Sequence, residues 1–282
     1  MSGKLAEIES RSTTAQQLDA VIGAMRGIAA ARSREAQGRL PGIRSSASTV
    51  GAAIGGVLAH GAGTSADTPE RGTQIVIALC AEQGFVGAFN EQILDHALVR
   101  HASADCEFLV VGTRGEIAAH DRRVALVWSS PAASHADDVP TLASRLTDAL
   151  YQRLDQRPIT GVCVIHAVPG IASHNEVVEH RLIPFDFSRF QVVRRNQPPL
   201  LTLPVGRLLS GLIEAYVYVE LCEALMLSFA AENEARVRAI LAARGHVKET
   251  LEELTQRYRR VRQDEITADI VELAAGVVQR ST

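Results

Sequence analysis

Residues 246–261 read HVKETLEELTQRYRRV, and their spacing indicates how the chain folds. The apolar residues follow one another at steps of four, three, four and three, with charged residues between them: Val247, Leu251, Leu254, Tyr258 and Val261. This is the spacing of a coiled-coil seam, where one face of a long helix packs against a second helix. The stretch therefore predicts a helix that needs a partner.

This helix is predicted to be very long. No proline occurs in the 78 residues that follow Pro204, and a helix of that length would reach about 110 Å. After a step of five, which indicates a register break, the seam resumes with Ile266, Ile270, Leu273 and Val277. A compact domain of this size cannot contain such a helix, so it must pair with another one.

The N-terminal segment supplies that partner. Over residues 4–59 the apolar side chains recur at three- and four-residue steps, from Leu5 and Ile8 to Ile28. Pro41 and Gly42 interrupt the pattern, so we expect the helix to kink or restart there. The Gly-, Ser- and Thr-rich run 61–69 ends it as a linker. We expect the two terminal helices to wind together, antiparallel, as a coiled coil.

The middle of the chain has a different pattern, which predicts an α/β domain inserted between the helices. Short β-branched runs that are apolar on both faces favour a parallel, Rossmann-like sheet covered by helices. The predicted strands are QIVIALC (74–80), EFLVVG (107–112), VALVW (124–128) and GVCVIHAV (161–168), with crossover helices in 88–101, 114–120 and 137–156. The predicted domains are 1–60, 61–204 and 205–282.

Composition excludes several functions. The net charge is -3 and the isoelectric point is near 6.3, so there is no general electrostatic reason to bind nucleic acid or an anionic membrane. No apolar stretch is long enough to span a bilayer, so any membrane association goes through a partner. The four cysteines form no CxxC pair, which favours a reducing, cytosolic setting without disulfides or zinc fingers.

No pattern of residues predicts catalysis or a cofactor. The run AEQGFVGAFN (81–90) has GxxG spacing after a strand, and GTRGE (112–116) is a second glycine turn; for both we favour a structural turn over a phosphate loop. His96 and His101 are five residues apart, which is poor metal-ligand spacing on a helix. Cys80 and Cys163 are interpreted as buried strand cysteines. The prediction is therefore no catalytic residue, no cofactor and no metal.

Several segments together resemble one family, the γ subunit of F-type ATP synthases. AENEARVRAI (231–240) and LEELTQRYRRVRQDEITADIVELAAG (251–276) are similar to its C-terminal signature, SExxARxxAM followed by LxxxYNxxRQxxITxEIxEIxxGA. LAEIESR (5–11) and AMRGIAAARSREAQ (24–37) resemble its opening. IALCAEQGFVGAFNEQIL (77–94) and HRLIPF (180–185) are similar to its middle blocks. The matches occur in the family's order over nearly the whole chain.

The resemblance implies a central rotor shaft, whose terminal helices form a coiled coil inside the hexamer of α and β subunits. Catalysis would then belong to β, so the chain itself is expected not to be an enzyme. The implied partners are the α and β subunits, the ε subunit and the c-ring. The implied location is the cytoplasmic face of the bacterial inner membrane, reached through partner subunits.

The resemblance also implies contact residues. Arg262, Gln263 and Thr267 fall on the RQxxIT positions that contact β in this family, although an exposed coiled-coil arginine would look the same in sequence. Met25 and Arg26 lie in an N-terminal block expected to face β at a similar height. Three acidic residues, Glu220, Glu232 and Glu272, are candidates for interhelical or partner contacts.

The chain departs from the family pattern at several positions. Gly23 and Gly27 stand where a lysine and a methionine are usual, and His246 and Arg259 replace asparagines. These departures leave open a standard γ or an alternative one of the sodium-type branch, and the coupling ion is not encoded here. Two other hypotheses remain: an α/β ligand-binding protein with coiled-coil oligomerisation arms, and a coiled-coil adaptor unrelated to ATPases.

Overall fold

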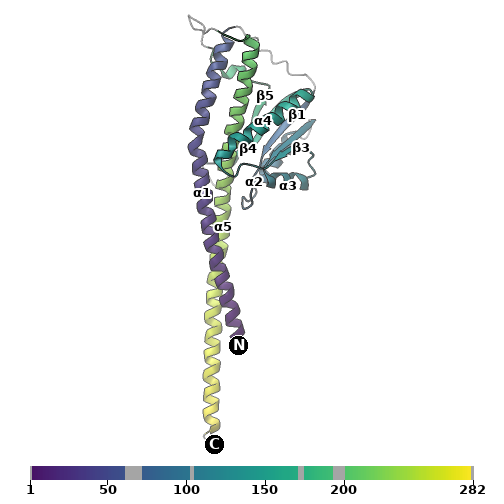
Figure 1. Cartoon of the computed structure of the whole chain (residues 1–282). Helices are drawn as coiled ribbons and strands as arrows, with labels where there is room; N and C mark the ends of the chain where they lie inside the picture. The colour runs from purple at the N-terminus through teal and green to yellow at the C-terminus, as the bar shows by residue number, and fades with distance from the viewer. Residues whose placement is uncertain (1, 61–71, 102–104, 171–174, 193–200, 281–282) are drawn as a thin grey trace. The chain divides into compact units, whose positions relative to one another are not determined.

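The computed structural model describes residues 2–60, 72–101, 105–170, 175–192 and 201–280. The elements are α1 (Ser2–Leu58), β1 (Thr73–Leu79), α2 (Phe89–His101), β2 (Cys106–Val111), α3 (Thr113–Asp121), β3 (Leu126–Ser130), the 3-10 turn η1 (Ala136–Asp138), α4 (Val139–Gln156), β4 (Ile159–Val168), β5 (Glu176–Ile183), the 3-10 turn η2 (Phe187–Arg189) and α5 (Val205–Arg280) (Figure 1).

The chain divides into two compact units. The smaller unit consists of Met1–Ile28 with Arg238–Thr282, and the larger one of Ala29–Val237. The larger unit thus holds the α/β domain together with the inner parts of α1 and α5. The predicted division into 1–60, 61–204 and 205–282 cuts across this unit, and it stays a prediction.

The sheet of the larger unit has five strands in the order β3-β2-β1-β4-β5. β1, β2, β3 and β4 are parallel, as the β-branched runs predict, with Ile77 opposite both Leu109 and Val164. β5 is antiparallel to β4 and forms one edge. The sequence pattern missed β5 as a strand because it alternates apolar and charged residues only weakly.

Both faces of the sheet are buried. On one face, side chains such as Ile75 and Ile77 pack with α4 and with the inner parts of α1 and α5 in one apolar cluster. On the other face, Val76 and Ala78 pack with α2 and α3 in a second cluster. Burial on both faces explains why the parallel strands read as continuous apolar runs.

The sequence predicts that the first helix kinks or restarts at Pro41 and Gly42, and the restart is wrong. α1 is one helix of 57 residues with Pro41 inside it. A proline in a helix interior removes one hydrogen bond and costs about 3 kcal/mol. Pro41 itself is exposed, while Ala36 and Leu40 are buried in the cluster with α4 and α5. This packing offsets the cost and keeps the helix continuous.

One buried histidine makes the larger unit sensitive to acid. His166 of β4 is 4% exposed, and its Nδ1 lies 3.2 Å from the carbonyl oxygen of Ala167. Burial disfavours the charged imidazolium and lowers the pKa of His166 to about 4. The histidine of the unfolded chain has a pKa of about 6.5. The contribution of His166 to the unfolding free energy is therefore fully present above a pH of about 6.5, and it is lost as the pH falls towards the folded pKa of about 4.

We expect the unfolding free energy to fall by about 2 kcal/mol between neutral pH and about pH 5 through His166 alone. The measurement is urea unfolding at both pH values, followed by the fluorescence of Trp128, the single tryptophan. His166→Gln should lose this part of the pH dependence, and the exposed His246→Gln should retain it. Equal pH dependence in the His166 variant would contradict the assignment.

Candidate partner-contact surface on the terminal helices

An ion pair defines the register of the two helices in the smaller unit. Nε and Nη2 of Arg244 donate to Oδ1 and Oδ2 of Asp19 at 2.7 and 2.9 Å. These hydrogen bonds lower the pKa of the Asp19 carboxyl. Ile8 and Ile22 of α1 and Leu254 of α5 are buried in the same unit. Leu254 is therefore the seam residue that the spacing predicts.

The larger unit repeats the antiparallel arrangement. Gln37 Nε2 donates to Glu234 Oε1 at 2.8 Å, and Arg44 Nε donates to Glu223 Oε1 at 2.7 Å. The α5 partner number falls as the α1 number rises, so the helices run in opposite directions in this unit. The antiparallel pairing predicted from the terminal segments is confirmed.

The last part of α5 has exposed apolar side chains among its described residues. Both helices rise about 1.5 Å per residue, so the Asp19–Arg244 contact places Ser2 level with about residue 261. Further along, Ile266 is 51% exposed and Ile270 60% exposed. The prediction that the seam continues through these two residues is wrong for the described part of the chain, because both side chains are exposed. The side chains of Leu273 and Val277 lie outside the described set.

Arg262, Gln263 and Thr267 lie on this last part of α5, and all three are exposed. The Thr267 hydroxyl donates to the carbonyl oxygen of Gln263 at 2.9 Å, within its own helix. The side chains of Arg262 and Gln263 make no hydrogen bond or ion pair to any other described residue. Residues four apart share a helix face, so Arg262 lies beside Ile266, and polar donors border exposed apolar surface.

The N-terminal candidates lie elsewhere on the coiled coil. Met25 is half-buried and Arg26 is exposed. The register places Met25 level with about residue 238, so it lies about 36 Å along the axis from Arg262. The expectation that the two groups lie at a similar height is therefore wrong. The cause is the antiparallel register, which the sequence pattern alone does not define.

The run 81–90 is a structural loop clamped by α5. Arg236 Nη2 donates to Glu232 Oε1 at 2.6 Å and to the carbonyl oxygen of Gln83 at 3.1 Å, and Nε donates to the carbonyl oxygen of Gly84 at 3.2 Å. The backbone N–H of Gln83 donates to Glu232 Oε1 at 3.5 Å. Burial raises the pKa of Glu232 despite the adjacent guanidinium. These contacts use the loop amide that a phosphate would need.

The second glycine turn is structural as well. Glu82 Oε2 accepts hydrogen bonds from the backbone N–H groups of Thr113 and Ala132 at 3.0 and 2.7 Å. Gly112 has a φ of 104°, and a Cβ there would lie 2.5 Å from the carbonyl oxygen of Cys80. Only glycine fits this close approach. The preference for structural turns over ligand loops therefore agrees with the structure at both places.

The acidic candidates on α5 make contacts within the larger unit. Glu220 Oε1 accepts from Arg189 at 2.8 Å, and its Oε2 lies 3.1 Å from His180 Nε2. Burial alone would raise the pKa of Glu220, but the hydrogen bonds and charges of these two residues lower it. Glu232 accepts the hydrogen bond from Arg236 that was described for the loop 81–90. The side chain of Glu272 lies outside the described set.

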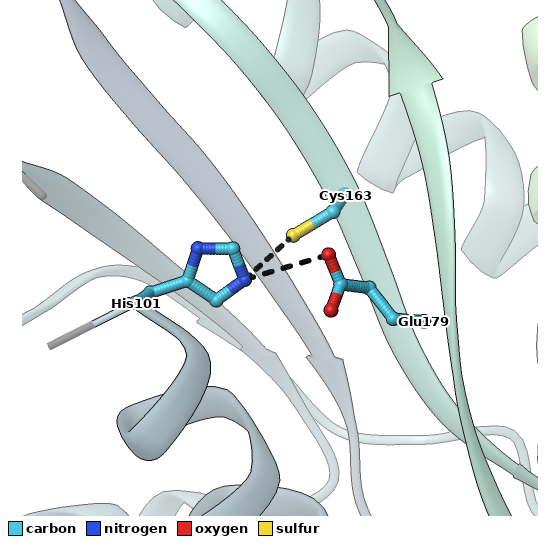
Figure 2. Close-up of side chains that lie close together, drawn as sticks. All are labelled: His101, Cys163 and Glu179. Carbon is cyan, nitrogen blue, oxygen red and sulfur yellow. Dashed lines mark hydrogen bonds and ion pairs between the residues drawn. The ribbon is translucent and has the colours of Figure 1, made fainter.

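A group of metal-ligating side chains also forms in the larger unit (Figure 2). His101 of α2, Cys163 of β4 and Glu179 of β5 present ligand atoms that all lie within 4.8 Å of one another. The sequence does not reveal this group, because its members come from three elements and have no common spacing. Cys80 and Cys163 are buried, as predicted, and burial raises the pKa of each thiol to about 12.

Two antiparallel terminal helices with an inserted, mostly parallel sheet define a class of protein: an α/β domain inserted between paired long helices. Comparison with solved structures agrees. A chain of the Euglena gracilis mitochondrial ATP synthase, from a structure that includes F1 and the c-ring, matches 99% of this chain and 95% of its own length. The TM-score is 0.68 and the identity 11%. The Tetrahymena thermophila mitochondrial ATP synthase central stalk matches 79% of this chain and 99% of its own length, with a TM-score of 0.58 and 19% identity.

Sequence comparisons name the family. The ATP synthase family model matches residues 4–278. The ATP synthase gamma chain of Parafrankia sp. (strain EAN1pec) is 26% identical over 98% of this chain and 97% of its own length. That of Salinibacter ruber is 27% identical over 96% of each chain. The chain belongs to the ATP synthase gamma family, and its role is that of a non-catalytic central-stalk subunit.

Proposed function

We propose that this chain is the rotor shaft that couples ion translocation through a c-ring to ATP synthesis or hydrolysis at β subunits. The observation that carries the proposal is the last part of α5, where Arg262, Gln263 and Thr267 are exposed beside the exposed Ile266. A helix surface that combines exposed polar donors with exposed apolar side chains favours contact with surrounding subunits. A shaft can stabilise different conformations of those subunits when its faces differ.

The proposed partners are the α and β subunits, the ε subunit and the c-ring. Among the described residues, no helix combines the length and the apolar character that crossing a bilayer requires. The proposed location is the cytoplasmic face of the bacterial inner membrane, where the proposed partner subunits hold the chain.

The proposal is tested by affinity purification of the tagged chain from its native membranes, with an assay of the eluate for ATPase activity and for α, β and c-ring bands. We expect an active multisubunit ATPase. Recovery of the chain without α and β would overturn the proposal and revive the ligand-binding or adaptor hypotheses.

Arg262→Ala is expected to reduce ion-coupled ATP synthesis about tenfold without preventing assembly. A charge-assisted hydrogen bond contributes about 1.5–3 kcal/mol, and its loss would affect only the rotor angles in which it forms. The readout is ATP synthesis by purified complexes in vesicles, with subunit composition measured alongside.

The matched control is Arg260→Ala, because Arg260 is also exposed but lies on a different face of the same helix turn. It should leave coupling unchanged. Normal coupling in the Arg262 variant would refute a contact role for that guanidinium, while the proposed shaft function would still stand on the purification experiment.

A further inference from the structure

Three side chains with different ligand atoms converge at the end of α2, on the sheet face that α2 covers (Figure 2). His101 is the last residue of α2, and its Nε2 lies 3.4 Å from Sγ of Cys163 on β4. The same Nε2 lies 3.8 Å from Oε1 of Glu179 on β5. The set therefore offers one nitrogen, one sulfur and one oxygen from three separate elements.

We propose that His101, Cys163 and Glu179 bind a divalent transition-metal ion, with Zn²⁺ the ion that fits best. Imidazole nitrogen, thiolate sulfur and carboxylate oxygen are all zinc ligands. Bond lengths of about 2.0–2.3 Å in a tetrahedral site place a nitrogen and a sulfur ligand about 3.5 Å apart, close to the distance here. Ca²⁺ and Mg²⁺ require oxygen ligands, so the mixed set disfavours them.

The contacts of His101 orient its ring for this role. Nδ1 lies 3.1 Å from Oε1 of Gln74 on β1. An amide oxygen only accepts hydrogen bonds, so Nδ1 carries the hydrogen and Nε2 presents its lone pair to Cys163 and Glu179. Metal-ligating histidines have this arrangement, in which the second ring nitrogen donates to an oxygen acceptor.

The two oxygens of Glu179 have separate surroundings. Oε2 accepts a hydrogen bond from Arg100 Nε at 3.2 Å and lies 3.7 Å from His96 Nε2. Oε1 faces His101. Arg100 therefore orients the carboxylate and leaves one oxygen for the ion. His96 is not part of the group whose ligand atoms all lie within 4.8 Å of one another, so a bound water would be the fourth ligand.

There is room for an ion beside these side chains. A cavity of about 130 Å³ is lined by the three ligands and by Gln74 and Arg181, among others. A water molecule occupies about 30 Å³, so the cavity can hold the ion with a bound water. Binding would release the thiol proton of Cys163 to solvent and form the metal–sulfur bond. It would tie the end of α2 to β4 and to the edge strand β5.

The experiment uses the full-length chain, purified and treated with a chelator, and titrates it with Co²⁺ as a spectroscopic probe. We expect one Co²⁺ per chain and the near-ultraviolet charge-transfer band of a cobalt–thiolate bond, which Zn²⁺ abolishes by displacement. Cys163→Ser should remove the band. Cys222→Ser, a buried cysteine of α5 outside the group, should retain it. Gln74→Leu should keep the band but weaken Co²⁺ binding 10–100-fold.

Two further variants separate the loss of a metal ligand from misfolding of the chain. His101→Gln and Glu179→Gln each remove one ligand, and each should weaken Co²⁺ binding at least about tenfold with an unchanged circular dichroism spectrum. The proposal is overturned if the wild-type chain shows no thiolate band, if the band persists in Cys163→Ser, or if all the ligand variants bind Co²⁺ as tightly as the wild type. None of these outcomes depends on assembly with other subunits.

Discussion

Arg236→Leu is expected to lower the unfolding free energy of the larger unit by about 3–5 kcal/mol. Arg236 is 6% exposed and Glu232 5% exposed, so the variant leaves a buried carboxylate without its cation. The carbonyl oxygens of Gln83 and Gly84 also lose their donors. Urea unfolding followed by Trp128 fluorescence measures the loss.

The control for this variant is Arg34→Leu, since Arg34 is exposed in the same unit and bonds only within its own helix, to the carbonyl oxygen of Ala30. It should change stability by less than about 0.5 kcal/mol. Adding Glu232→Gln to Arg236→Leu removes the unpaired charge and should restore part of the loss. An Arg236→Leu chain within about 1 kcal/mol of the wild type would show that the clamp contributes little.

The pH dependence of Arg236→Leu provides a second check on the same pair. Burial raises the pKa of Glu232 even with Arg236 present, and removal of the guanidinium raises it further. A carboxyl group whose folded pKa is raised costs stability as the pH increases. The deficit of the variant relative to the wild type should therefore be smaller at about pH 5 than at neutral pH.

Leu254→Asp is expected to open the coiled coil of the smaller unit locally. Leu254 is 7% exposed at a seam position, so the variant loses apolar burial and places a carboxylate there. A cost of about 3 kcal/mol lowers amide protection about 100-fold in the segment 247–261. Hydrogen exchange with mass spectrometry on the full chain measures this amide protection for each segment.

Gln256→Asp is the matched control, because it introduces the same side chain two residues away at an exposed position. It should leave the exchange of 247–261 nearly unchanged. The sheet of the larger unit should keep its protection in both variants. If Leu254→Asp exchanged like the wild type, residue 254 would not be a seam position and the register described above would be wrong.

Much of the fold was predictable because it depends on periodicity. The 4-3-4-3 spacing around Leu254 requires a partner helix, and apolar runs such as residues 74–80 require cover on both faces of a sheet. These patterns identify the paired helices and the four parallel strands. The structural role of the glycine turns was also foreseen, since their spacing lacks the phosphate-binding signatures.

The resemblance of several motifs, in the family's order, also pointed to the family, while the packing of particular residues depended on the tertiary structure. Whether α1 continues through Pro41 depends on the burial of Ala36 and Leu40. Whether Ile266 is covered depends on how the two helices pair, and in the structure it is 51% exposed. Such outcomes come from contacts between residues far apart in the chain, which local spacing does not record.

The group of His101, Cys163 and Glu179 shows the same limit most clearly. Each residue is unremarkable in its own segment: the last residue of a helix, a strand cysteine and an acidic residue on an edge strand. The local spacing of apolar residues predicts helices and strands along the chain, but it does not show which of their side chains meet. Only the crossover of α2 over the sheet and the antiparallel pairing of β5 with β4 bring their ligand atoms within 4.8 Å, because that convergence depends on strand order and packing rather than on spacing along the chain.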